Sequence, residues 1–289
     1  MFGLWDKLTE WIKELLLGMI ENNLSNMFTD VNEKVGSIAA EVGKSPQSWD
    51  SDIFSMIESL SENVIVPIAG LVITFVLCYE LISMLIDRNN LHDVDTWMFF
   101  KWVFKAYVAV VIVTNTWNIV MGTFDVAQKM VNQASGVISS ETSIDIASSI
   151  ESMMTGLEKK ELAELLLISL ETLIVTFAMD ILSILITVIL YGRMIEIYLV
   201  SSVASIPMAT LANKEWGHTG TNYFKSLFAL AIQAFFIMVC VGIYAVLIKT
   251  LTVTDNIHTS IFSVLAYTVL LCFSLFKTGS LAKSVLNTH

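Results

Sequence analysis

The stretch Tyr191–Leu230 lies between two long apolar runs and reads YGRMIEIYLVSSVASIPMATLANKEWGHTGTNYFKSLFAL. Its small residues recur at every fourth position, at Ser201, Ser205 and Ala209, and Pro207 lies within this pattern. Small residues at this spacing let helices approach closely in lipid, whereas a proline inside a helix removes a backbone hydrogen bond. The stretch therefore predicts a broken segment whose small residues pack against helices, with membrane-spanning helix on either side.

The same stretch also carries charged groups at defined positions. Arg193 and Glu196 stand three residues apart and so share one helical face. Polar residues over 213–222 then lead into a new helix that begins near Lys225. Residues 194–212 could cross the membrane, re-enter it or stay on its cytoplasmic side, and the sequence favours the arrangements in which they do not cross.

The composition is that of a membrane protein. The chain of 289 residues is 55% hydrophobic and only 15% charged, with a mean hydropathy of +0.70, whereas soluble domains carry about 25% charged residues. Several runs exceed the roughly 18 apolar residues that indicate a transmembrane helix. The sequence predicts an all-α polytopic membrane protein with about five transmembrane helices, near residues 64–86, 98–124, 165–190, 223–248 and 261–276.

Four regions follow from this pattern. An external amphipathic helical region covers 1–61, and a transmembrane hairpin covers 62–124. An external Ser-rich, acidic loop with a short helix covers 125–164, and a transmembrane region with a cytoplasmic tail covers 165–289, including the stretch 191–222.

The N-terminal region carries apolar residues at helical spacing, and charged residues occupy the opposite side. We expect this helix to lie on the membrane surface or to pack on a partner subunit. Because no basic segment precedes an apolar core, we expect no cleavable signal. The stripe comprises Leu4, Trp5, Leu8, Trp11, Ile12, Leu15, Leu16 and Met19, and it continues weakly through Leu24, Met27, Phe28 and Val31.

The basic residues predict the orientation in the membrane. With five spans the two termini lie on opposite sides, and Lys and Arg are denser on the side that holds 87–97, 191–222 and the C-terminal tail. Cytoplasmic segments are enriched in Lys and Arg. We therefore expect a multi-pass protein of the inner, or cytoplasmic, membrane, with its N-terminus outside and its C-terminus in the cytoplasm.

The first two spans contain charged residues at similar depth. Glu80 lies near the cytoplasmic end of span 1, and Lys101 and Lys105 lie near the start of span 2. A charge at the bilayer centre costs about 2.5–3.5 kcal/mol on insertion scales, so such residues usually pair or face water. We predict that Glu80 pairs with Lys101 or Lys105, either to hold the hairpin or to line a pore, although Lys101 could instead snorkel to the surface.

Other polar groups inside the spans have no obvious partner in the sequence. Glu171 and Asp180 lie nine residues apart in span 3, on opposite helical faces, and Gln233 lies inside span 4. Intramembrane carboxylates are candidates for proton relays or cavity linings. The alternative is hydrogen bonding at an interface between subunits.

No catalytic motif is present. The chain has no Walker A loop, GxGxxG turn, HExxH or GxSxG. Its three cysteines form no CxxC pair, and its four histidines are far apart, so we expect neither a metal site nor a cofactor. The sequence has no basic stripe interleaved with aromatic residues, so we do not expect stable nucleic-acid binding. We do not expect an enzyme.

Three stretches carry a resemblance to a known family, namely SSVASIPMATLA (201–212), GTNYFKSLFALAIQ (220–233) and KTGSLAKSVL (277–286). With the external N-terminus, external loop and cytoplasmic C-terminus, they resemble the TrbL-like family. This family includes the sixth VirB subunit, the polytopic inner-membrane component of type IV secretion and conjugation systems. At the level of this plan the resemblance covers most of the chain.

The resemblance implies a homo-oligomeric channel or scaffold subunit of a conjugative type IV secretion system. Such a subunit would work beside other membrane subunits and ATPases within the lipid bilayer, and DNA or protein would contact it only transiently. Its axis would be lined by spans 1 and 2 or by the stretch Arg193–Ala209. One alternative is an ion channel or small-solute transporter, in which Glu171, Asp180 and Gln233 would form a midplane site; another is a holin-like membrane scaffold.

Overall fold

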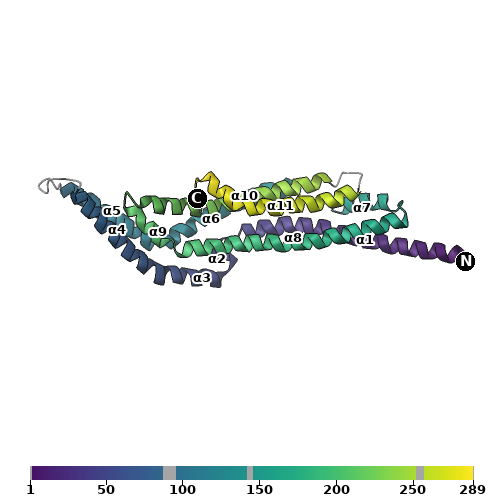
Figure 1. Cartoon of the computed structure of the whole chain (residues 1–289), viewed down its shortest axis with the longest axis horizontal. Coiled ribbons are helices and arrows are strands. Elements are labelled where there is room, and N and C mark those ends of the chain that lie inside the picture. The colour runs from purple at the N-terminus through teal and green to yellow at the C-terminus, as the bar shows by residue number, and fades with distance from the viewer. Residues whose placement is uncertain (1, 87–95, 142–145, 252–256, 289) are drawn as a thin grey trace. The chain divides into compact units, whose positions relative to one another are not determined.

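The computed structural model describes residues 2–86, 96–141, 146–251 and 257–288, and these residues form helices joined by short turns (Figure 1). Among these residues, five helical stretches are long and apolar enough to cross a membrane: Ser51–Ile86, Thr96–Thr114, Leu162–Ala212, Gly217–Thr250 and Ile257–Val285. The predicted all-α polytopic membrane fold with five spans is therefore confirmed.

The helices follow one another in a simple order along the chain. They are α1 (Phe2–Val42), α2 (Pro46–Trp49), α3 (Ser51–Leu60), a π-helical turn η1 (Ser61–Ile65), α4 (Val66–Ile86), α5 (Thr96–Thr114), α6 (Thr116–Glu141), α7 (Ile146–Leu157), α8 (Leu162–Ser202), α9 (Ser205–Ala209), a 3₁₀ turn η3 (Thr210–Ala212), α10 (Gly217–Leu251) and α11 (Ile257–Val285).

The chain divides into two compact units. Unit 1 comprises Met1–Val42, Val131–Leu190 and Phe236–Thr278. Unit 2 comprises Gly43–Met130, Tyr191–Phe235 and Gly279–His289. The four helices α6, α8, α10 and α11 contribute residues to both.

In unit 1, α1 runs parallel to the chain segment that contains α7 and the first part of α8. The Nζ of Lys13 donates to the carbonyl oxygen of Glu158 at 2.6 Å, and Asn23 donates to the hydroxyl of Thr172 at 3.1 Å. Because both residue numbers rise together, the two segments share a direction. Residues such as Phe28 of α1 are fully buried in the core of this unit.

The two parts of the predicted stripe of α1 differ in their burial within the chain. Trp11 and Leu15, in the strong part of the stripe, are exposed. Leu24 and Val31, in its weaker continuation, are fully buried. The exposed part of the stripe remains a surface for the predicted contact with the membrane or a partner subunit, whereas the buried turns lie beside the rest of unit 1.

In unit 2, α4 and α5 form an antiparallel hairpin, and the short helices α9 and η3 pack against it (Figure 1). Their shared core contains small residues such as Ala69 of α4, Ala109 of α5 and Ala209 of α9, together with Ile73 and Val76. Small side chains on all three elements permit close backbone approach.

The first span begins further upstream than the sequence suggested. The predicted span starts near residue 64, but helical structure runs from Ser51 through Ile86 and contains Pro67. Proline lacks an N–H and clashes with the carbonyl four residues earlier. The π-helical turn Ser61–Ile65 lies just before Pro67, where it accommodates that clash.

The region between spans 2 and 3 also differs from its predicted form. The second span is divided at Asn115, whose side-chain amide donates to the carbonyl oxygen of Val111 at 2.9 Å. Helix α6 then continues to Glu141, so much of the loop expected over 125–164 is helical. Its residues Ala127 and Val131, one turn apart, are buried, and this packing stabilises helix where composition alone suggested a loop.

Candidate functional site

The broken segment predicted from Pro207 and the small residues around it is present. Helix α8 ends at Ser202, α9 and η3 follow as two short helical pieces, and α10 begins at Gly217. The side-chain oxygen of Asn213 accepts hydrogen bonds from the backbone N–H groups of Glu215 (2.7 Å) and Trp216 (3.0 Å). This turn reverses the chain and leads it into α10.

The small residues of this segment are packed inside unit 2. Ser201, Ser205 and Ala209 are completely buried, and Pro207 is half-buried. At Gly220, in the first turn of α10, an added Cβ would lie 2.6 Å from the carbonyl oxygen of Pro207. Glycine is therefore required where the start of α10 crosses the broken segment.

Glu80 on α4 is the centre of a polar network that joins three elements. The Nζ of Lys105 on α5 donates to one carboxylate oxygen at 2.5 Å. The side-chain amide of Asn213, which follows η3, donates to the other at 2.7 Å. The sequence predicted a pair with Lys101 or Lys105, and the structure forms the pair with Lys105. Lys101 is exposed, with its Nζ 5.7 Å from the ring centroid of Trp97.

Aromatic and acidic side chains extend this network at the end of α4. The ring of Trp216 stacks against those of Phe75 and Tyr79, with centroids 5.5 and 5.3 Å apart. The hydroxyl of Tyr79 donates to a carboxylate oxygen of Glu215 at 3.0 Å. These contacts fix the turn after η3 against the last turns of α4.

A polar cavity of about 400 Å³ lies beside this network. Its lining combines three charged side chains with amide, hydroxyl and thioether groups: Tyr79, Glu80, Ser83, Met84, Asn213, Lys214 and Glu215. Charged groups within membrane-spanning segments usually face the protein interior or a water-filled space. A cavity with this lining is suited to hold water and polar solutes.

Arg193 and Glu196 share a face of α8 but have different surroundings. Arg193 is buried, and its Nη2 donates to the carbonyl oxygen of Leu230 on α10 at 3.4 Å. Glu196 is half-buried and pairs with Lys283 of α11 at 3.3 Å. Gln233 of α10 is buried and packs against Gly279 of α11.

The two carboxylates of span 3 lie in unit 1, where each has a basic side chain nearby. Glu171 accepts a hydrogen bond from Nδ1 of His258, the second residue of α11, at 2.7 Å. Asp180 is exposed on α8 and lies near Lys34 of α1. The Nζ of Lys34 lies 3.4 Å from the carbonyl oxygen of Met179. Burial lowers the pKa of Lys34, and the negative charges of Asp30 and Asp180 partly oppose this shift.

The eight polar candidates are divided between the two units. Glu80, Lys101, Lys105, Arg193, Glu196 and Gln233 belong to unit 2, and Glu171 and Asp180 belong to unit 1. Sequence reasoning missed Asn213 and His258, which lie far along the chain from the carboxylates that they contact. The sequence signals Asn213 and His258 only as polar residues between two apolar runs.

Within the described ranges, no group of three or more His, Cys, Asp or Glu side chains is placed to hold a metal ion. His92 and His289 lie outside those ranges. The site thus consists of ion pairs, hydrogen bonds and a polar cavity against a broken helix.

Five apolar helices, a broken helical segment and charged groups between the spans define a polytopic α-helical membrane protein. A family model described as TrbL/VirB6 plasmid conjugal transfer-like protein matches residues 31–205, which is more than half of the chain. The chain belongs to this family and is a membrane component of conjugal transfer systems. The match ends inside the first of the three resembling stretches. No curated protein and no solved structure matches the chain.

Proposed function

We propose that the chain assembles as a homo-oligomeric channel or scaffold in the inner membrane, through which a conjugative type IV secretion machine transfers DNA and protein. The family supports a place in such a machine. The polar cavity beside Glu80 supports a channel, because it lies between the membrane-spanning helix α4 and the turn that ends the broken segment.

The broken segment is the main physical reason for assigning the channel to unit 2. Non-helical backbone at membrane depth is tolerated where it is buried in protein or lines a water-filled space. The segment meets the first condition, since α9 is packed against α4 and α5. Asn213 and Glu215 border the polar cavity, which we propose is filled with water. We assign this cavity to the wall of the transfer path.

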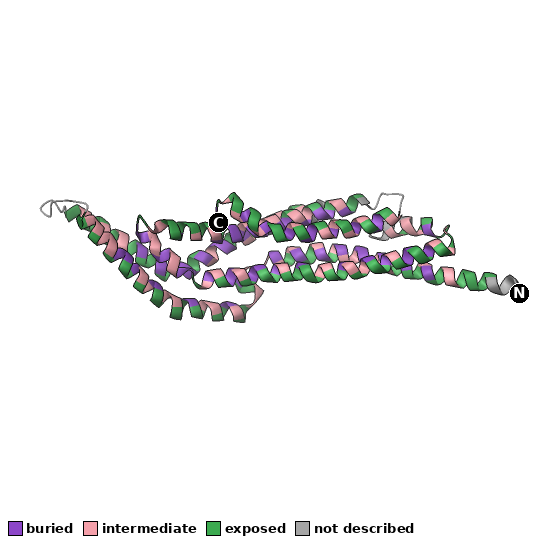
Figure 2. Cartoon of the chain, viewed as in Figure 1, coloured by how far each residue is buried: buried purple, intermediate pink, exposed green. Residues whose placement is uncertain are grey.

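The α4–α5 hairpin also offers surface for assembly. In the most apolar part of α5 only 11% of residues are buried within the chain, compared with 56% in α10 (Figure 2). Other copies, other membrane subunits and lipid are the surroundings that this surface suits. ATPases of the machine would supply the energy, and the chain itself would be non-enzymatic, with its N-terminus outside and its C-terminus in the cytoplasm.

The first experiment measures transfer of a marked mobile element from donor cells that lack this chain. Transfer should fall by several orders of magnitude and recover with the intact chain. Unchanged transfer would remove the chain from the transfer machine. The size of the purified complex in lipid nanodiscs is measured in parallel, and a strictly monomeric particle would contradict the homo-oligomer.

A second experiment tests whether the cavity contains water. Cys78, Cys240 and Cys272 are replaced by alanine, and a single cysteine is introduced by Ser83→Cys inside the cavity. A membrane-impermeant thiol reagent should label this cysteine. The control is Val110→Cys, since Val110 is exposed on α5 but does not border the cavity. Equal, negligible labelling of both would contradict a water-filled path.

A further inference from the structure

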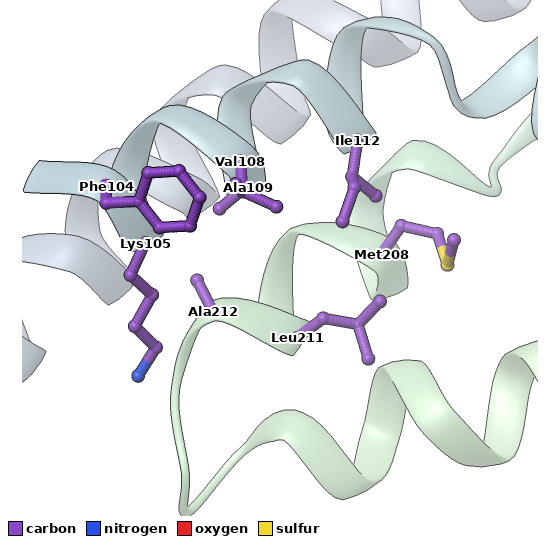
Figure 3. Close-up of a pocket in the computed structure, with 8 residues that line it drawn as sticks. All are labelled: Phe104, Lys105, Val108, Ala109, Ile112, Met208, Leu211 and Ala212. Atoms are coloured by element: carbon purple, nitrogen blue, oxygen red, sulfur yellow. The ribbon is translucent and has the colours of Figure 1, made fainter. Parts of the chain in front are cut away.

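A second cavity in unit 2 has a different chemical character from the polar one. It is a groove of about 270 Å³ between α5 and the segment formed by α9 and η3. Apolar side chains of α5 and of the broken segment line it, and Lys105 is its only charged residue: Phe104, Lys105, Val108, Ala109, Ile112, Met208, Leu211 and Ala212 (Figure 3).

The α5 wall of this groove changes from basic to apolar along the helix. Lys101, Lys105, Val108 and Ile112 are separated by four, three and four residues, and so lie on one helical face. Lys101 to Ile112 spans about 16 Å of helix, which is close to the thickness of one leaflet's hydrocarbon core, about 15 Å. The exposed Trp97 marks the basic end, as tryptophan does at membrane interfaces.

Lys105 can bind an anion without losing its partner on α4. Its pair with Glu80 uses one of the three N–H donors of the ammonium group. Asn213 holds the other carboxylate oxygen of Glu80, so the carboxylate stays oriented. The side chain of Lys105 remains 40% exposed and lines the groove.

We propose that this groove binds one anionic phospholipid, with an acyl chain against Phe104, Val108 and Leu211 and the phosphate beside Lys101 and Lys105. The groove volume of about 270 Å³ is below the roughly 300–1,000 Å³ of pockets that hold whole drug-sized ligands. It is therefore too small for a protein helix, which is about 10–12 Å wide, and suits an acyl chain. Two lysines at one end favour an anionic headgroup over a zwitterionic one. The bound lipid would complete the packing of the broken segment against α5.

Photo-crosslinking of the full chain in nanodiscs tests this site. The probe is phosphatidylglycerol with a diazirine in one acyl chain, mixed into phosphatidylethanolamine. The matching phosphatidylcholine probe serves as the comparison. Labelled peptides should contain residues 104–112 or 208–212, and phosphatidylglycerol should label them at least fivefold more than phosphatidylcholine. Equal labelling by the two probes would overturn the proposal, because it indicates bulk lipid at an exposed surface.

Matched variants separate the headgroup from the acyl chain. Lys101→Gln should lower phosphatidylglycerol labelling about fivefold, as expected for one lysine near the surface. Lys105→Gln is combined with Glu80→Gln, so that no buried carboxylate is left unpaired. Val108→Trp should block the groove, whereas Val110→Trp, on another face of α5, should leave labelling unchanged. Retained labelling in Val108→Trp, or groove residues that crosslink to a second copy instead of lipid, would overturn the proposal.

Discussion

The network around Glu80 should stabilise unit 2 well beyond an ordinary surface ion pair. Glu80→Ala removes the hydrogen bonds from Lys105 and Asn213. Lys105 is 40% exposed, so its share is reduced by solvent toward the roughly 0.2–1 kcal/mol of exposed pairs. Asn213 is only 3% exposed, and a buried amide without an acceptor costs about 1–3 kcal/mol. The expected loss in the free energy of unfolding is about 1–4 kcal/mol.

The structure provides a matched control for the ionic part of this effect. Lys160 and Glu164 also lie 2.5 Å apart, and the lysine is equally exposed, but the carboxylate is 40% exposed rather than 15%. Double-mutant cycles with glutamine replacements should give a coupling of about 1 kcal/mol for Glu80 and Lys105, against about 0.3–0.5 kcal/mol for the control pair.

The assay is reversible unfolding by steric trapping in lipid bicelles, which reports the free energy of unfolding in a bilayer-like medium. Glu80→Gln should cost less than Glu80→Ala, because the glutamine oxygen can still accept the bond from Asn213. A coupling for Glu80 and Lys105 no larger than that of the control pair would refute the reasoning that partial burial strengthens this network.

Three further predictions concern packing, pairing and protonation. Gly220→Ala should lower the free energy of unfolding by about 1–3 kcal/mol through overpacking. The control is Gly122→Ala, whose added Cβ meets nothing within 4 Å and which should raise the free energy of unfolding by up to about 1 kcal/mol. Equal shifts in Tm for the two variants would contradict this. His258→Ala and Glu171→Gln should each lower the free energy of unfolding by about 0.5–1.5 kcal/mol. The double variant should lose little more than either single variant, so additive losses would argue against the pair. Burial lowers the pKa of Lys34 in the folded chain, so the unfolded chain holds more protons between the two pKa values and stability should rise with pH there. Lys34→Met should flatten this rise in unfolding measurements at alkaline pH, and an unchanged slope would exclude Lys34 as its source.

Much of the plan was predictable because it depends on local sequence. The length of an apolar run and the thickness of the bilayer decide whether a segment can span, and that criterion correctly predicted five spans. The pairing of Glu80 with a lysine of the next span was predictable for a similar reason. Two spans joined by a short connection return antiparallel, so residues near that connection lie at similar depth.

The helix ends were less predictable, because they depend on burial that a composition window does not measure. The polar composition after residue 124 favours a loop, yet α6 continues to Glu141 with Val131 buried. Along α1, Leu24 and Phe28 are fully buried, whereas Trp11 is exposed, and the amphipathic pattern by itself does not distinguish these turns.

The partners of the remaining polar groups come from distant parts of the chain. Asn213 lies 133 residues from Glu80, and His258 lies 87 residues from Glu171. Hydrophobicity and charge order along the chain are sufficient to specify a membrane protein with five spans and its family plan. Which side chains meet depends on the register and crossing of packed helices, which result from many small contacts summed over each unit, and no single stretch of sequence contains that sum.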